Sequence, residues 1–125
     1  MTVISKLIIH INLYNIKGLI TFKTAKLAKE KGLLIPPQKN WYTRTGNFNS
    51  YSPKSPYWVI TQSLLQKWLR EEYIIDINIT RVGSDFPYYL QITQYGNKCD
   101  ILGFDEYFII YEEALEKGLQ EALKL

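Results

Sequence analysis

Residues 61–73 have the sequence TQSLLQKWLREEY and carry a complete set of signals for an amphipathic helix. Thr61 is a residue type that caps helix N-termini through its hydroxyl, and Ile60 is placed to pack onto Leu65 as a hydrophobic staple. The helical repeat puts the large apolar residues on one face. The predicted inward face is Leu64, Leu65, Trp68 and Leu69, and the predicted outward face is Gln62, Gln66, Lys67, Arg70 and Glu71.

A second helix is predicted over residues 21–31. Thr21 is its expected N-cap, Gly32 suits a left-handed C-cap, and Pro36-Pro37 prevents any continuation. The inward residues are then Phe22, Ala25, Leu27 and Ala28. The outward side becomes a basic stripe of Lys23, Lys26, Lys29 and Lys31.

The third predicted helix runs from residue 111 to the C-terminus. Its inward stripe repeats at helical spacing and consists of Tyr111, Ala114, Leu115, Gly118, Leu119, Ala122 and Leu123. The small-residue row of Ala114, Gly118 and Ala122 predicts the close approach of another helix or of a sheet, with helix 61–73 as the natural neighbour. Its glutamates are expected on the solvent face: Glu112, Glu113, Glu116 and Glu121.

Alternating apolar and polar residues predict four strands, at residues 3–14, 74–82, 88–95 and 99–102. Turn residues separate the last three, at 83–87 and 96–97, which is typical of an antiparallel meander. We therefore expect one α+β domain over residues 1–125. In it, an antiparallel sheet of three to five strands is packed by helices 61–73 and 111–125, with helix 21–31 on the rim.

Composition excludes several classes of protein. The chain has 125 residues, of which 46% are hydrophobic and 22% are charged, as expected for a globular domain rather than a disordered chain. One cysteine (Cys99) and one histidine (His10) allow neither an internal disulfide nor a zinc site. No phosphate loop, dinucleotide fingerprint or nucleophile elbow occurs. We expect no metal, no cofactor, no membrane span and a cytoplasmic location.

Charge is divided sharply along the chain. Residues 1–70 hold eleven basic residues and one acid, a net charge of +10, whereas residues 71–125 hold four basic residues and eleven acids, a net charge of −7. Either the first half forms a basic face for an anionic partner, or the two halves pack together and neutralise each other. The sequence leaves both readings open.

Residues 38–58 are the candidate binding segment. They contain no acid and mix aromatic with basic side chains, a combination that single-stranded nucleic acids contact by stacking and by phosphate pairing. The alternative is an irregular hairpin, turning at Thr45-Gly46-Asn47, whose aromatics cover the core. The candidate binding residues are Trp41, Tyr42, Arg44, Phe48, Tyr51, Lys54, Tyr57 and Trp58.

Three blocks of this sequence resemble a family of small uncharacterised proteins from gut Bacteroidales genomes and their phages and mobile elements: ITFKTAKLAKEKG, TQSLLQKWLREEYIIDINI and YEEALEKGLQEALKL. Ile60 departs from the proline frequent in that family before the second block, and Ile110 from the Ser, Thr or Asp before the third. The resemblance implies a bacterial host cell and a phage or mobile-element context. It implies no reaction.

Two functions follow as hypotheses. The first is a non-enzymatic binding or regulatory protein that acts by occupying a host or phage protein or an effector. The alternative is a nucleic-acid-binding protein that uses the basic first half and residues 38–58. The predicted order of elements from residue 61 onward is similar to that of double-stranded RNA-binding domains, a likeness of topology alone. An enzyme ranks below both, because no catalytic constellation is visible.

Overall fold

The computed structural model describes residues 18–34, 38, 41–43, 45–49, 57–85, 87–96 and 100–125, with the backbone alone at 48–49, 100 and 102–106. In these residues the chain forms three helices and two antiparallel sheets, which confirms the α+β class. The elements are α2 (Phe22–Lys31), β1 (Trp41–Tyr42), β2 (Phe48–Asn49), β3 (Tyr57–Trp58), α3 (Gln62–Tyr73), β4 (Ile75–Arg81), β5 (Tyr88–Gln94), β6 (Asp100–Phe108) and α4 (Tyr111–Leu123). The strand predicted at residues 3–14, His10 and Cys99 lie outside the described residues.

The larger sheet is an antiparallel meander in the order β4-β5-β6. Strands β4 and β5 confirm the predictions, since Ile75, Ile77, Leu90 and Ile92 all point into the core. The third strand is nine residues long, so the prediction of a short strand at 99–102 was wrong. The second half of the strand, FDEYF, does not alternate apolar and polar residues, so the sequence pattern does not predict it. A register shift between Tyr89 and Gln91 lets β6 continue to pair with β5.

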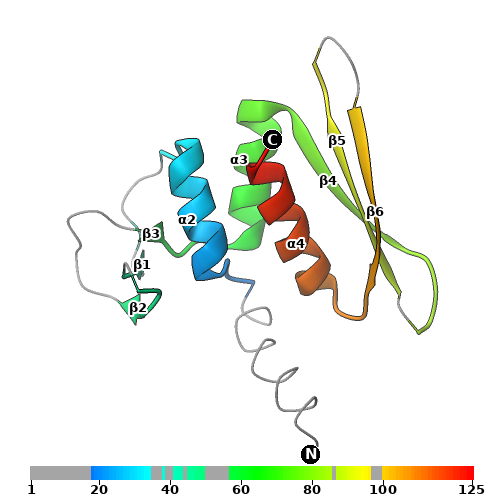
Figure 1. Cartoon of the computed structure of the whole chain (residues 1–125), viewed down its shortest axis with the longest axis horizontal. Helices are drawn as coiled ribbons and strands as arrows, with labels where there is room; N and C mark the ends of the chain where they lie inside the picture. The colour runs from blue at the N-terminus through cyan, green and yellow to red at the C-terminus, as the bar shows by residue number, and fades with distance from the viewer. Residues whose placement is uncertain are drawn as a thin grey trace, which may run out of the picture.

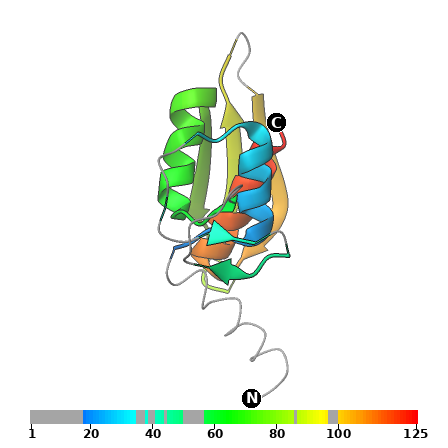
Figure 2. The same ribbon diagram turned by 90° about the vertical axis from the view of Figure 1, so that its left-hand side faces the viewer.

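Three layers make up the described fold (Figure 1). Helices α3 and α4 lie against one face of the β4-β5-β6 sheet, and α2 with the small sheet lies beyond them (Figures 1 and 2). The prediction that helix 21–31 sits on the rim was therefore wrong. Its buried residues are Thr24, Ala25 and Ala28, and α2 packs on α4, where Glu116 and Gln120 hydrogen-bond to Thr24.

The predicted helix caps are confirmed. The Thr21 hydroxyl accepts a hydrogen bond from the Thr24 backbone N–H at 3.4 Å, and the Thr61 hydroxyl accepts one from the Leu64 N–H at 3.1 Å. Gly32 ends α2 with a left-handed φ of 99°. Helix α3 ends at Ile74, a β-branched residue that also has left-handed dihedrals, φ 54° and ψ 45°.

The inward face of α3 differs from the prediction at two positions. Gln62 is 2% exposed and Leu64 is 39% exposed, whereas the sequence pattern gave the opposite arrangement. The helix is turned so that Gln62 faces α4, where its amide donates to the Glu112 carbonyl at 2.9 Å. That hydrogen bond compensates for burying the amide. Leu65, Trp68 and Leu69 contact the core as predicted.

The small-residue row of α4 is buried and allows the sheet to approach closely. A Cβ on Gly118 would lie 2.7 Å from Ile77 Cγ2 and 2.8 Å from a Leu90 methyl carbon. The close neighbour at Gly118 is thus the sheet, one of the two neighbours that the sequence predicts, rather than helix 61–73, which was the preferred one. Tyr111 is 41% exposed and lies outside the inward stripe, which correctly includes Leu115, Leu119 and Leu123.

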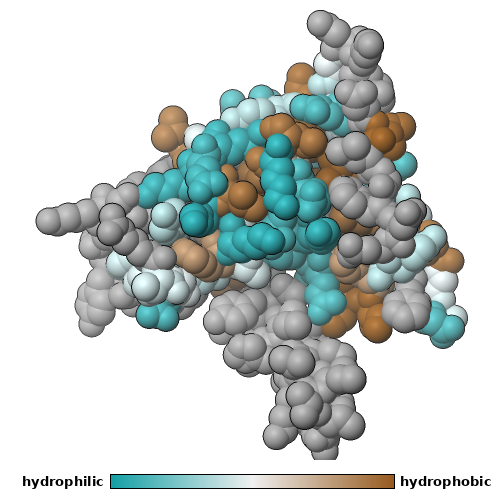
Figure 3. Space-filling model, in the orientation of Figure 1, coloured by the Kyte–Doolittle hydropathy of each residue, from teal (hydrophilic) through white to brown (hydrophobic). Residues whose placement is uncertain are grey.

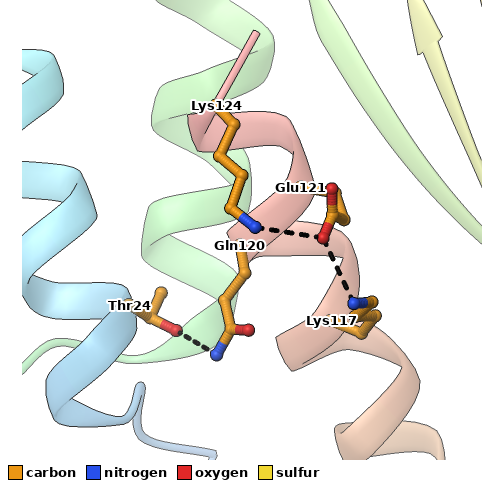
Figure 4. Close-up of polar contacts among 5 residues, drawn as sticks. All are labelled: Thr24, Lys117, Gln120, Glu121 and Lys124. Carbon is orange, nitrogen blue, oxygen red and sulfur yellow. Dashed lines mark hydrogen bonds and ion pairs between the residues drawn. The ribbon is translucent and has the colours of Figure 1, made fainter.

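Glu116 is buried, so its predicted place on the solvent face was wrong. Its carboxylate accepts the Thr24 hydroxyl at 2.6 Å and the Thr21 backbone N–H at 3.0 Å, which fixes the N-terminus of α2 onto α4. Burial raises the pKa of Glu116, and hydrogen bonds from Thr24, Thr21 and Gln62 offset only part of that rise. The Gln120 amide donates to Thr24 at 3.1 Å and completes the contact between the two helices (Figure 4).

Candidate functional site

The hairpin of β1 and β2 turns at residues 43–47, as the sequence predicts. Gly46 has a left-handed φ of 89°, and the Thr43 N–H donates to the Asn47 carbonyl at 2.8 Å. The hairpin is held against the start of α2 by ring contacts: Phe22 meets Tyr42 and Tyr57 edge-on, with centroid distances of 5.8 and 5.6 Å. Phe22 therefore ties the small sheet β2-β1-β3 to the rest of the fold.

The structure separates the candidate binding residues into groups with different environments. Tyr42 belongs to the core, because it is 2% exposed and its hydroxyl donates to the Ile20 carbonyl at 2.7 Å. Trp41, Tyr57 and Trp58 are half-buried, and the Trp41 indole N–H has no acceptor among the described residues. Phe48 pairs with Tyr42 through its backbone. Three candidates lie outside the described residues: Arg44, Tyr51 and Lys54.

A groove crosses the C-terminal ends of α2 and α3. It consists of two depressions of about 310 and 420 Å³ that share Gly32 and Leu34. The depression toward β3 is lined by Ala25, Lys29, Leu33 and Trp58, and the depression toward α3 by Trp68, Glu72 and Tyr73. We call this surface the α2–α3 groove.

The most prominent apolar side chain of the groove is Leu34, which is 90% exposed. Trp58 and Trp68 are half-buried and offer ring surface next to it. Exposed apolar area of this kind costs free energy in water, roughly 25 cal/mol for each Å². The depression toward β3 is mainly apolar, whereas polar and apolar atoms line the depression toward α3 about equally, so the apolar contact of a partner would centre on Leu34 and Trp58.

The lysines near the groove are engaged with aromatic rings. Lys29 Nζ lies 4.7 Å above the Tyr57 ring, and Lys31 Nζ lies 4.2 Å above the Tyr73 ring while donating to the Leu125 carbonyl at 2.8 Å. Both sit in the last turn of α2, where a cation compensates the negative end of the helix. Their charge thus serves the fold, while Lys23 and Lys26 point to solvent.

Sequence reasoning missed most of the groove. Trp68 was assigned to the core because it falls on the apolar stripe of α3, and it does contact the core with one side of its ring. Leu33 and Leu34 follow the cap glycine in the run GLLIPP. The available signal for the groove was this pair of leucines between a helix cap and a Pro-Pro pair. The segment continues neither a helix nor a strand, so the core is not expected to bury both side chains.

No metal site or membrane span is found in the part of the chain that the structure describes. No three His, Cys, Asp or Glu side chains there gather to hold a metal ion. None of the described helices combines the length and apolar character needed to cross a bilayer. Comparisons with protein-family models, with curated proteins and with solved structures find no match to the chain.

Proposed function

We propose that this chain is a non-enzymatic binding protein that occupies a partner protein through the α2–α3 groove. The observation that carries the proposal is the exposed Leu34 beside the rings of Trp58 and Trp68 in a concave surface. Such a surface suits an aliphatic or aromatic side chain inserted by a protein partner. The cytoplasm of a bacterial host and a phage or mobile-element context belong to this proposal through the family resemblance.

Charge at the groove supports a protein partner over a nucleic acid. Helices α2 and α3 both end there, so their partial negative charges and the Glu72 carboxylate oppose a phosphate. We therefore expect the partner segment to insert an apolar anchor side chain and no acidic one at this groove.

The test is capture of a partner by the immobilised full chain from a lysate of a Bacteroidales host, followed by calorimetry with the purified partner. Leu34→Asp is expected to weaken binding at least about tenfold, because it places a charge in the apolar contact. Leu64→Asp is the matched control, since Leu64 is exposed on α3 and does not line the groove. If the captured protein binds Leu34→Asp as tightly as the unchanged chain, the groove is not the binding surface.

Nucleic-acid binding is the second candidate. The order α3-β4-β5-β6-α4, with both helices on one face of the sheet, is similar to that of double-stranded RNA-binding domains. Glu112 and Glu113 occupy the first turn of α4, however, and repel phosphate from the helix end that would otherwise attract it. Titration with labelled single- and double-stranded oligonucleotides at low salt decides the matter, because phosphate-driven binding weakens steeply as salt rises.

A further inference from the structure

The depression of the α2–α3 groove that lies toward α3 combines an aromatic ring with an unpaired carboxylate. Trp68 and Glu72 both line it, and they are four residues apart on α3, so ring and carboxylate share one face of the helix. Within the described part of the chain Glu72 has no ion pair, whereas its neighbour Glu71 pairs with Lys67 at 3.9 Å. The Glu72 carboxylate is therefore available to a group from outside the chain.

The electrostatic field in this depression favours a positive charge. Gly32, the C-cap of α2, lines it together with the last turn of α3, which contains Glu72. Each helix end carries a partial negative charge of about half an elementary charge on its last carbonyl groups. A carboxylate at this end of a helix is repelled by the dipole of its own helix, and a bound cation would relieve that repulsion. The charge of Glu72 thus suits a cationic ligand better than it suits the helix.

A cation of this chain already contacts the aromatic residues at this edge. Lys31 Nζ lies 4.2 Å above the Tyr73 ring and donates to the Leu125 carbonyl at 2.8 Å, while the Tyr73 hydroxyl donates to the Lys31 carbonyl at 3.0 Å. Trp68 meets Tyr73 edge-on, with centroids 5.1 Å apart. No cation of the described residues lies over the Trp68 ring. Tyr73 is thus engaged by Lys31, and Trp68 is the ring that can receive a cation from a partner.

We propose that the protein partner of the α2–α3 groove inserts an arginine side chain against Trp68 and Glu72, next to the apolar anchor that contacts Leu34 and Trp58. This inference rests on the proposed function and adds the charge of the partner segment. Arginine suits the site because its planar guanidinium stacks on an indole and forms paired hydrogen bonds with a carboxylate.

The two contacts are close enough for one segment to make both. Leu34 and Gly32 line both depressions, so the apolar contact and the arginine contact adjoin each other. In the space-filling view an apolar group projects among hydrophilic side chains at the C-terminal end of α2, where the two depressions meet (Figure 3). We therefore expect the apolar residue and the arginine at neighbouring positions of the partner segment.

Selection of short random peptides displayed on phage against the immobilised full chain tests the proposal. We expect the enriched peptides to combine an aliphatic or aromatic residue with arginine. The affinity of the most enriched peptide is then measured by fluorescence polarisation. Glu72→Lys should weaken it at least about tenfold, because attraction becomes repulsion. Glu71→Lys is the matched control. It makes the same charge change on the adjacent residue, which lines neither depression, and should alter the affinity less than about twofold.

A double-mutant cycle shows whether the arginine contacts Glu72 itself. The peptide arginine is replaced by glutamine, and Glu72→Gln is made in the protein, a change that also replaces Glu72→Lys if circular dichroism shows the lysine variant to be unfolded. If the two groups are in contact, both changes together weaken binding by clearly less than the product of the separate losses. Separate losses that simply multiply would overturn the inference.

The same measurements separate this inference from the proposed function. Peptides that lose binding to Leu34→Asp, yet carry no arginine or bind Glu72→Lys as tightly as the unchanged chain, overturn the inference and leave the proposed function standing. Peptides that bind Leu34→Asp as tightly as the unchanged chain overturn both, as does a selection that yields no binder.

Discussion

Replacing Gly118 by alanine tests how closely α4 approaches the sheet. On an exposed helix this change would raise the free energy of unfolding by about 1 kcal/mol, because alanine has the higher helix propensity. Here the new methyl group would lie 2.7 Å from Ile77 Cγ2 and 2.8 Å from Leu90 Cδ1. Carbon atoms pack favourably at about 3.5–4.0 Å, so both contacts would be too short by about 0.7 Å or more.

Neither neighbour of Gly118 yields easily. Ile77 Cγ2 is attached directly to the Cβ of a strand residue, so it moves only if the χ1 angle or the strand itself shifts. Leu90 is fully buried, so its methyl group moves only if its close-packed neighbours rearrange. Overpacking of this kind costs about 1–3 kcal/mol, and two contacts place Gly118→Ala in the upper part of that range. After the gain in helix propensity, we expect a net loss of about 1–2 kcal/mol.

Urea denaturation followed by circular dichroism measures this difference, and a fall in melting temperature of roughly 3–6 °C for each kcal/mol accompanies it. The internal control is the same substitution in an Ile77→Ala background, which removes Cγ2. If the clash is the cause, the loss from Gly118→Ala should shrink or reverse there. A Gly118→Ala protein that is more stable than the unchanged chain would refute the close approach of α4 to the sheet.

Two further substitutions test single features of the fold. Glu116→Ala should lower the free energy of unfolding by about 2–4 kcal/mol in urea denaturation, because the Thr24 hydroxyl and the Thr21 N–H lose their acceptor; a loss below about 1 kcal/mol would show that they find another. Because the pKa of Glu116 is raised in the folded state, the stabilisation from its protonated form is complete below the unfolded pKa of about 4.5 and is lost as pH rises through the folded pKa. The free energy of unfolding of Glu116→Gln, relative to that of the unchanged chain, should therefore increase from pH 4.5 to pH 7. Ile74→Gly should raise the free energy of unfolding by about 1 kcal/mol, and with it the melting temperature, because glycine adopts left-handed dihedrals without strain and Ile74 is more than half exposed. An unchanged or lower melting temperature would contradict strain at this cap.

The candidate site shows where sequence reasoning stops. The aromatic segment 38–58 was identified as unusual, yet Tyr42 is a core residue and Trp58 lines a groove. Composition cannot distinguish a core aromatic from a groove aromatic in the same segment, because only the residues around each ring in the folded structure differ. Leu34 and Trp68 enter the groove because α2 and α3 end side by side, a relation between segments more than thirty residues apart that no local pattern contains.

Features that depend on neighbours within one helical turn or one strand can be predicted from the sequence alone. Thr21, Thr61 and Gly32 mark helix ends because a cap bonds to backbone three to five residues away. The isoleucines of β4 predict a half-buried strand because successive side chains alternate between its faces. These signals also predicted the α+β class.

The face of each helix that meets the core, by contrast, depends on how the elements pack together. Gln62 is buried and Leu64 is exposed, the reverse of the prediction, and Glu116 is buried as well. The reason is that α4 packs between the sheet and α2, where Gln62 bonds to α4 and Glu116 bonds to α2. A polar residue is buried when a partner from another element satisfies it, and that partner lies 92 residues away for Glu116 and 50 for Gln62. Local pattern carries no information about such partners, so the fold alone sets those positions.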